Sequence, residues 1–315
     1  MWYYRYQLVS KDSLNAKSVQ RIHEGCLLRS EEGGVACLHP WPSLGDPSLD
    51  QLLDGLARGR EHPMLQSAKH CMEIDSEARK QNVSLFDQLS VPLSHATITG
   101  GVEQVHQAVS KGFGCVKIKL GKKGAQQQKE FLEHVHNEYP QLQLRLDWNQ
   151  SQSAQDCATW LSALPSSLRQ MIDFVEDPYL SEDHDWSLVR EMSAVEVALD
   201  REASLGLDHY DVLVIKPAMA SPEALVEEAS QRLRRVVFTS MMDHPIGQNY
   251  AAWCAGNINE SYHGVVDVCG LMTHELYEPT AFSQELGAVS PEWNYAQGSG
   301  LGFDDLLEQI EWKRF

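Results

Sequence analysis

Short apolar runs rich in β-branched residues recur along the chain from about residue 95 onward, with amphipathic stretches between them. Each run has the length of a buried strand, whereas segments such as VEQVHQAVSKG (102–112) repeat apolar residues at three and four, as one face of a helix does. The predicted strands are residues 95–100, 115–121, 142–149, 172–178, 195–200, 211–217, 235–243 and 263–271. Alternating strands and helices predict βα units, and eight strands favour a closed parallel barrel over an open doubly wound sheet.

The first 90 or so residues follow a different pattern. Alternating residues in MWYYRYQLV (1–9) and GCLLRSEEGGVACLH (25–39) predict strands, with a turn at 31–34, and SAKHCMEIDSEARKQ (67–81) predicts a helix. The Pro- and Gly-rich stretch HPWPSLGD (39–46) predicts an irregular loop. This part of the chain is therefore an α+β region that precedes the barrel.

The amino-acid composition argues against nucleic acids and membranes as binding partners. Acidic residues outnumber basic ones by 44 to 26 and give a formal charge of −18, which repels nucleic-acid phosphates and anionic lipid headgroups. No charged leader and no apolar run of about 18 residues occurs, so we expect a cytoplasmic protein with neither nucleic acid nor membrane as a partner. The seven cysteines form no CxxC pair, which argues against a disulfide framework or a zinc knuckle.

Three successive predicted strands end in an acid. They are Asp147 in LRLDWN, with Asn149 two residues on, Glu176 in FVEDPY, and Asp200 in VALD. Functional side chains of a barrel gather at the carboxyl ends of the strands, so these acids should converge. Converging carboxylates repel unless a divalent cation neutralises them, and all-oxygen ligands suit Mg²⁺ or Mn²⁺. The alternative for each acid is a solvated or helix-capping role, which we assign to Asp177, a turn residue before Pro178.

Lysines flank these acids along the chain. Lys117 and Lys119 share one face of CVKIKLG, and Lys216 ends DVLVIKP two strands after Glu176. Burial and nearby positive charge lower the pKa of a lysine, which can then remove a carbon-bound proton. Taken singly, each lysine could instead be a surface residue. Together with the acids, they predict metal-assisted proton abstraction next to the carboxylate of a small-molecule substrate.

The order K-x-K, D-x-N, E-D-P, a strand ending in Asp, and I-K-P resembles the enolase superfamily, and in it the subgroup similar to muconate lactonising enzyme. The short chain and compact N-terminal region look most like the o-succinylbenzoate synthases. The resemblance implies an α/β fold with an N-terminal α+β capping domain and a modified TIM barrel, (β/α)₇β. The capping domain would span residues 1–92, completed by the C-terminal segment 280–315, and the barrel with the active site would span residues 93–279.

The resemblance also implies roles. Asp147, Glu176 and Asp200 would bind Mg²⁺, with Mn²⁺ as the alternative ion. Lys119 would be the acid and base of a dehydration in menaquinone biosynthesis, and Lys216 would stabilise the ene-diolate by its charge. Residues that would contact the substrate are Lys117, Asn149, Ser240, Met241, Gly270 and Leu271. Loops near Gly25 and at residues 39–46 would cover the mouth.

Other functions remain open. An N-acylamino acid racemase on the same scaffold would use Lys119 and Lys216 on opposite faces of one carbon. Dipeptide epimerases of the superfamily typically carry Asp-x-Asp in the last strand loop, and CGLMTHE (269–275) lacks it. Many members carry a glutamate after the seventh strand, where this chain has Asp243. A metal-free Schiff-base aldolase using Lys216 and a non-catalytic protein are the remaining alternatives; oligomeric state is unknown.

Overall fold

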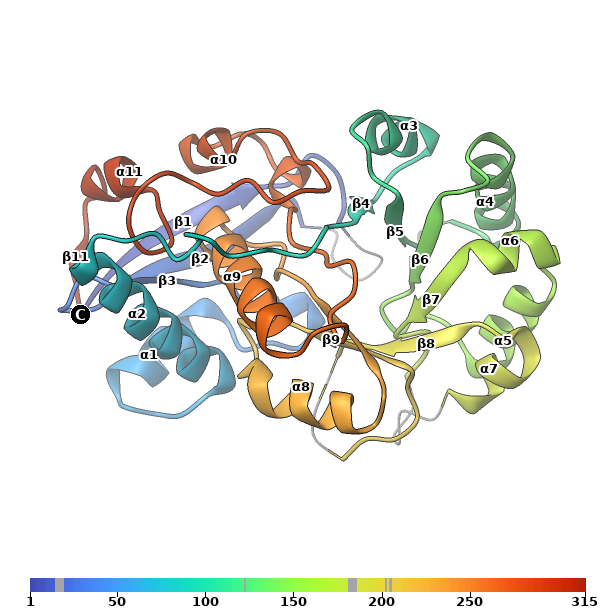
Figure 1. Ribbon diagram of the computed structural model, residues 1–315, viewed down its shortest axis with the longest axis horizontal. Helices are drawn as coiled ribbons and strands as arrows, with labels where there is room; N and C mark the ends of the chain where they lie inside the picture. The colour runs from blue at the N-terminus through green and yellow to red at the C-terminus, as the bar shows by residue number, and fades with distance from the viewer. Residues whose placement is uncertain (15–19, 122, 181–185, 202, 204–205) are drawn as a thin grey trace.

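The computed structural model describes the whole chain except residues 15–19, 122, 181–185, 202 and 204–205. Within the described residues, one four-stranded antiparallel sheet and one seven-stranded parallel sheet form the framework (Figure 1). The predicted fold class, a small N-terminal α+β domain with a modified TIM barrel, is confirmed. The boundaries proposed between the two domains stay a prediction.

The antiparallel sheet has the order β11-β1-β2-β3. Strand β2 contributes Leu27 and Leu28 to the apolar core, and both side chains are fully buried. The buried Asp75 carboxylate accepts the backbone N–H groups of Val35 (2.7 Å) and Leu301 (2.6 Å), so a helix, a strand and the C-terminal segment are joined at one point. The elements are β1 (Trp2–Val9), β2 (Ile22–Arg29), β3 (Val35–Leu38), η1 (Pro42–Leu44), α1 (Leu49–Ala57), α2 (Pro63–Gln81), α10 (Ala281–Leu286), α11 (Asp304–Glu308) and β11 (Lys313–Arg314).

The parallel sheet follows the chain order from β4 to β10. Its strands are β4 (Ala96–Ile98), β5 (Cys115–Lys119), β6 (Gln143–Asp147), β7 (Ile172–Glu176), β8 (Glu196–Leu199), β9 (Val212–Ile215) and β10 (Arg235–Phe238). Each lies within one of the first seven predicted strands. They are almost wholly buried, as parallel strands covered on both faces must be.

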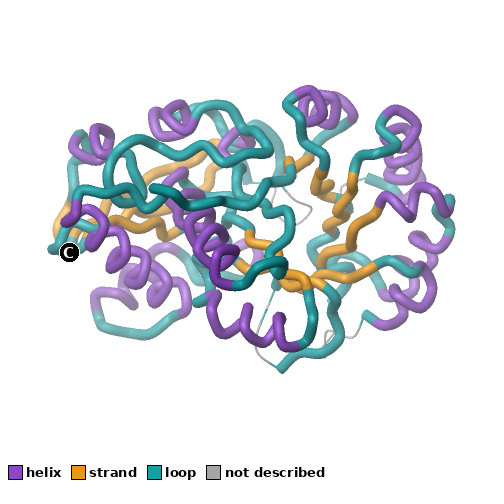
Figure 2. Tube along the Cα trace, in the orientation of Figure 1, coloured by secondary structure: helices purple, strands orange, loops and turns teal. Residues whose placement is uncertain are grey.

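Helices lie outside the curled sheet (Figure 2). They are α3 (Val102–Ser110), α4 (Ala125–Glu138), α5 (Ala154–Ser162), α6 (Ser166–Met171), α7 (Ser187–Ser193), α8 (Pro222–Gln231) and α9 (Pro245–Ser261), and η2 (His274–Leu276) follows. Where the structure describes the chain, no helix has both the length and the apolar character that a membrane span requires. All seven cysteines are described, and all are free.

The eighth predicted strand, residues 263–271, is wrong as a continuous strand. The segment makes isolated parallel bridges instead, from Val266 to Val236 and from Gly270 to Thr239 on one side, and from Cys269 to Ser94 on the other. The pairing with β10 changes register by one residue between Val266 and Gly270, and within that stretch the N–H of Val268 donates to the Asp267 carboxylate (2.6 Å). The segment therefore occupies the eighth position, between β10 and the residues that precede β4, without regular pairing.

A small apolar cluster fills one level of the barrel interior. Its members are Phe174, Ala198, Val212, Val214 and Val237, all at most 1% exposed. The guanidinium of Arg145 lies 4.6 Å from the centroid of the Phe174 ring and pairs with Asp173 (2.8 Å), below the strand ends that carry the acids. The packed interior leaves the carboxyl ends of the strands as the place for a cavity.

Candidate active site

A cavity of about 380 Å³ opens at the carboxyl ends of the barrel strands. Its volume is in the range that holds a small organic molecule. Residues of the N-terminal domain close one side and barrel residues form the rest. The lining includes Trp41, Leu44, Gly45, Asp46, His62, His95, Thr97, Lys117, Lys119, Asn149, Asp200, Arg201, Lys216, Ser240, Met241 and Gly270.

The two lysines of β5 lie against two of the predicted acids. Lys119 Nζ is 2.5 Å from Asp147 Oδ2. Lys117 Nζ lies between two carboxylates, 2.5 Å from Glu176 Oε1 and 3.1 Å from Asp147 Oδ2. All four side chains are at most 7% exposed. The predicted same-face arrangement of the two lysines therefore brings both of them to the acids of the next two strands.

The third acid has its own lysine. Lys216, directly after β9, donates to both carboxylate oxygens of Asp200, directly after β8. Both residues line the cavity, and the Lys216 side chain is 24% exposed. The structure thus brings together all five charged residues that the sequence placed at successive strand ends, and it adds Lys117 as a bridge between two of the acids.

Burial and the neighbouring charges shift the pKa values of Asp147 and Glu176 in opposite directions. Burial acts to raise the pKa of Asp147, but the charges of Lys119 and Lys117 outweigh it and hold that pKa well below its usual range. Burial raises the pKa of Glu176 to about 8, and the charges of Asp147 and Asp200 act in the same direction. Glu176 is therefore the carboxylate that gains most from an added positive charge.

Burial and neighbouring charges also shift the pKa values of Asp200 and Lys117. Burial acts to raise the pKa of Asp200, but the nearby Lys216 charge lowers it overall. Burial acts to lower the pKa of Lys117, and the charges of Glu176 and Asp147 raise it above its ordinary value. Lys117 is thus a fixed positive charge between two carboxylates.

The donor set fits a hard divalent cation. Asp147, Glu176 and Asp200 offer only oxygen ligands, as Mg²⁺ prefers, and burial, together with the charges of Asp147 and Asp200, raises the pKa of Glu176. The three carboxylates do not all approach within 4.8 Å of one another, because each is paired with a lysine. Their role as metal ligands stays a prediction.

The predicted substrate-contacting residues divide into two groups. Lys117, Asn149, Ser240, Met241 and Gly270 line the cavity. Leu271 is fully buried in the apolar core and is not among the lining residues. Its backbone N–H donates to Ser94 Oγ (3.0 Å), so Leu271 packs behind the residues that line the cavity.

Two of the lining residues have backbone or steric requirements. Asn149 has φ +48° in the left-handed region, which asparagine tolerates, and its N–H donates to Asp147 Oδ1 (2.9 Å). At Gly270 a Cβ atom would lie 2.6 Å from the His95 ring, so a side chain there would displace His95. Both positions fix neighbouring side chains of the cavity.

Of the two segments predicted to cover the mouth of the barrel, residues 39–46 are found at the cavity. Residues 39–46 lie over the cavity, where Trp41 Nε1 donates to the backbone oxygen of Met241 (2.7 Å). Gly25 itself lies inside β2, opposite Tyr6, where a Cβ atom would collide with the Tyr6 hydroxyl. The glycine provides room for that tyrosine within the sheet. The segment before β2 includes residues 15–19, which lie outside the described residues, so a covering loop there stays a prediction.

Family comparisons bear on both parts of the chain. The family model of the o-succinylbenzoate synthase N-terminal domain matches residues 1–78, and the enolase C-terminal domain-like family model matches residues 101–214. An o-succinylbenzoate synthase from Bdellovibrio bacteriovorus is 31% identical over 326 aligned positions, which cover 98% of this chain and 97% of that protein. The chain belongs to the o-succinylbenzoate synthase family of the enolase superfamily. It is therefore an enzyme by family, and the resemblance read from the sequence is confirmed.

Solved structures of the superfamily share the fold. The L-Ala-D/L-Glu epimerase from Bacillus subtilis has a TM-score of 0.76 at 15% identity, covering 95% of this chain and 96% of that chain. The N-succinyl Arg/Lys racemase from Bacillus cereus has a TM-score of 0.78 at 14% identity, covering 99% and 98%. The dipeptide epimerase from Enterococcus faecalis, complexed with Mg and L-Leu-L-Tyr, has a TM-score of 0.73 at 18% identity, covering 95% and 97%. These identities are low, so the likeness shows the fold alone.

Sequence reasoning missed Asp177, which it treated as a turn residue. The residue does have a turn conformation, with φ +41°, but its side chain is fully buried. Its carboxylate accepts the backbone N–H groups of Asp200 and Arg201, each at 3.0 Å. Asp177 therefore fixes the backbone of one predicted metal ligand. The signal was a second acid directly after a strand-terminal one.

Two further cavity residues were missed. His95 is buried at the floor, where its Nδ1 lies 3.0 Å from Arg145 Nη1, and burial lowers its pKa well below the usual value. Arg201 donates to the backbone oxygen of Leu44, so the residue after Asp200 touches the covering loop. The sequence does show a histidine at the start of the first predicted barrel strand and an arginine after a strand-terminal acid, but the residues that they contact lie far away along the chain.

Proposed function

We propose that this enzyme converts 2-succinyl-6-hydroxy-2,4-cyclohexadiene-1-carboxylate into o-succinylbenzoate, a step of menaquinone biosynthesis. A proton leaves the ring carbon next to the carboxylate, hydroxide leaves the adjacent ring carbon, and the two depart as water while the ring becomes aromatic. The observation that carries the proposal is the similarity to an o-succinylbenzoate synthase over 98% of the chain, including the N-terminal region matched by that family's own model.

Mg²⁺ is the proposed cofactor, held by Asp147, Glu176 and Asp200. When bound, it would supply Lewis-acid stabilisation of negative charge that develops on the substrate carboxylate. The same ion would neutralise Glu176, whose burial beside two other acids otherwise favours the protonated form. Mn²⁺ offers the same preference for oxygen ligands and is the alternative.

Lys119 is the proposed acid and base. Its side-chain nitrogen lies in the cavity wall, 2.5 Å from Asp147 Oδ2, and as the neutral amine it would take the ring proton at Nζ. After taking the ring proton, Lys119 returns it to the departing hydroxyl on the same face of the ring, which makes the elimination syn. One nitrogen atom, Lys119 Nζ, thus both accepts the ring proton and donates it to the leaving hydroxyl.

Lys216 reaches the cavity from β9, four strands from Lys119 on β5. Its proposed role is electrostatic: the ammonium stabilises the ene-diolate that follows proton loss. Lys117, fixed between Glu176 and Asp147, adds positive charge where the substrate carboxylate would lie. Residues 39–46 would exclude water from above, with Trp41 anchored to Met241.

Racemisation or epimerisation is the second candidate. Lys119 and Lys216 line one cavity from separate strands, as a two-base exchange at a single carbon requires, and the solved structures similar to this chain include a racemase and epimerases. This reaction needs Lys216 to exchange a proton, whereas the dehydration needs only its charge.

The test follows the ultraviolet absorbance of the cyclohexadiene substrate on incubation with the protein, in Mg²⁺ and in EDTA. We expect a rapid, metal-dependent loss of the diene signal that disappears in Lys119→Ala. Lys129→Ala, at a partly exposed position of α4, is the matched control and should retain full activity. No turnover by a folded protein that binds Mg²⁺ would overturn the synthase proposal.

Lys216→Arg separates the two candidates. An arginine keeps the positive charge but cannot give up a proton at neutral pH. Dehydration should therefore survive in this variant at a reduced rate, whereas exchange of the α-proton of N-succinyl amino acids or dipeptides with deuterated solvent should stop. Efficient exchange in the wild type, together with absent dehydration, would make the protein a racemase or epimerase.

A further inference from the structure

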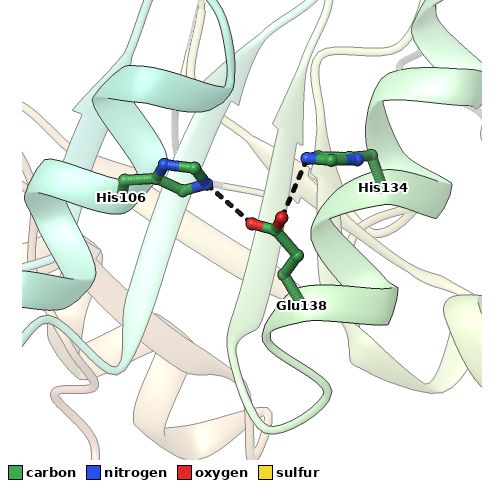
Figure 3. Close-up of side chains that lie close together, drawn as sticks. All are labelled: His106, His134 and Glu138. Atoms are coloured by element: carbon green, nitrogen blue, oxygen red, sulfur yellow. Dashed lines mark hydrogen bonds and ion pairs between the residues drawn. The ribbon is translucent and has the colours of Figure 1, made fainter.

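Two helices on the outside of the barrel bring two histidines and a glutamate together. Figure 3 shows His106 on α3 pointing across to His134 and Glu138 on α4, with the carboxylate between the two imidazole rings. The metal-ligating atoms of the three side chains all lie within 4.8 Å of one another, and of the residues that the structure describes only these three satisfy that condition.

The cluster is remote from the cavity. Glu138 is the last residue of α4, and the chain then enters β6 at Gln143, the end of that strand opposite Asp147. The carboxyl end of β6 carries the candidate active site, so the cluster lies at the other end of the barrel. None of its three residues lines the cavity.

The geometry is close to that of a bound ion. His106 Nε2 lies 2.6 Å from Glu138 Oε2, and His134 Nε2 lies 3.3 Å from Glu138 Oε1. Zinc with bonds of about 2.0–2.1 Å to nitrogen and oxygen in a tetrahedron sets its ligand atoms roughly 3.3 Å apart. Small side-chain rotations would therefore place the three atoms around one centre. His134 and Glu138 are four residues apart on one helix, so they share a face.

Supporting groups surround the first histidine. Glu103 Oε2 lies 3.9 Å from His106 Nδ1, the nitrogen that would remain free when Nε2 binds a metal. An outer carboxylate in this position orients a metal-binding imidazole and increases its basicity. The Tyr139 ring packs edge-on against His106, with centroids 5.7 Å apart. The side chains are 38%, 50% and 39% exposed for His106, His134 and Glu138, so an ion could enter from solvent and keep a water ligand.

We propose that His106, His134 and Glu138 form a second metal site, which binds Zn²⁺ or a similar divalent transition metal and links α3 to α4. Two imidazoles and one carboxylate suit zinc, whereas the all-oxygen set at the strand ends suits Mg²⁺. The two sites therefore select different ions. The high negative charge of the chain, −18, favours cation binding in general and does not choose between them.

The experiment measures Zn²⁺ binding to the intact, metal-stripped protein by isothermal titration calorimetry at pH 7.5, with millimolar Mg²⁺ present to occupy the oxygen site. We expect one Zn²⁺ per chain with a dissociation constant in the micromolar range or tighter. His106→Ala and Glu138→Gln should each weaken that binding at least about tenfold. His70→Ala, an exposed histidine on α2, is the matched control and should bind as the wild type does.

A second readout separates ligation from a structural effect. Zn²⁺ should raise the thermal unfolding midpoint of the wild type and of His70→Ala, and it should leave that of His106→Ala unchanged, because an ion that binds only the folded state stabilises it. Circular dichroism and turnover with Mg²⁺ should be the same in all variants. Wild-type Zn²⁺ affinity in His106→Ala and Glu138→Gln, or no binding by the wild type, would overturn the proposal.

Discussion

Lys117 and Glu176 form a buried ion pair, with 2.5 Å between Nζ and Oε1 and neither side chain more than 7% exposed. The same ammonium also lies 3.1 Å from Asp147. In a metal-free protein this lysine is the cation that balances the buried Glu176, and it shares Asp147 with Lys119. Its contribution to folding should therefore depend on whether another cation is present.

Replacing Lys117 by methionine, which has a similar shape and no charge, removes the cation beside Glu176 and leaves Asp147 paired with Lys119 alone. Breaking a buried pair in this way costs about 3–5 kcal/mol. We expect Lys117→Met to lose stability of this order in EDTA, and Mg²⁺ to restore more stability to the variant than to the wild type. Urea unfolding with and without Mg²⁺ measures both effects.

The control for this prediction is Lys129→Met, a partly exposed lysine on α4 whose Glu133 partner is 3.8 Å away. Its unfolding free energy should stay within about 0.5 kcal/mol of the wild type in either solution. Equal Mg²⁺ stabilisation of the wild type and Lys117→Met would show that the lysine and the metal do not neutralise the same carboxylates.

Asp177 should act through the backbone of Asp200. Its carboxylate accepts two N–H groups there, and Asp177→Ala leaves both of them buried without that acceptor. Loss of such an outer partner typically weakens metal binding by about 10–100-fold. We expect Asp177→Ala to need correspondingly more Mg²⁺ for half-maximal activity, as a Mg²⁺ titration of turnover would measure. Asp156→Ala, an exposed acid on α5, should leave the titration unchanged.

Much of the candidate site could be predicted because chain order equals strand order in a parallel barrel. An acid or lysine at a strand end, such as Asp147 or Lys216, is placed near the same rim by the fold alone. The runs of β-branched residues also located the first seven strands, because buried parallel strands are rich in such residues. At 263–271 the pattern failed as a continuous strand, because the pairing with β10 changes register between Val266 and Gly270.

What the sequence could not show depends on contacts between distant residues. The partners of Asp177 are backbone groups 23 and 24 positions away, and Trp41 meets Met241 across 200 positions. A glycine in a strand and one in a loop look alike until the neighbour is known. Gly25 was placed in a lid for that reason, whereas it lies beneath Tyr6 in β2.

The Trp41 hydrogen bond should hold the covering loop on the barrel. Trp41→Phe keeps the ring in its buried place but removes the N–H that donates to Met241, 2.7 Å away. Loss of one buried hydrogen bond costs about 1–3 kcal/mol. We expect lower stability by this amount and a roughly several-fold higher KM, because the loop closes the cavity less tightly. Steady-state kinetics and urea unfolding provide the two readouts.

Trp312→Phe is the matched control, since its Nε1 donates to Leu307 (3.3 Å) in the C-terminal segment, away from the cavity. The comparison is direct because both substitutions remove the same atoms. A change in stability without any change in KM for Trp41→Phe would mean that the bond supports the fold and not the closure of the site.

Asp243 should make stability depend on pH. Burial raises its pKa from 3.8 to about 7, and its Oδ1 has no hydrogen-bond partner among the described residues. The folded state therefore keeps a proton that the unfolded state loses, and stability should fall as pH rises from about 4 to 7 and then level off. Asp243→Asn removes the titrating group and should be the more stable protein at pH 8, with the difference closing below about pH 4.

Each pKa unit corresponds to about 1.4 kcal/mol, so the difference at pH 8 should reach a few kcal/mol. Urea unfolding of both proteins between pH 4 and pH 8 measures it, and Asp12→Asn, at an exposed position, serves as the control. A difference that did not change with pH would mean that Asp243 is ionised throughout this range. The buried carboxylate would then need a counter-charge.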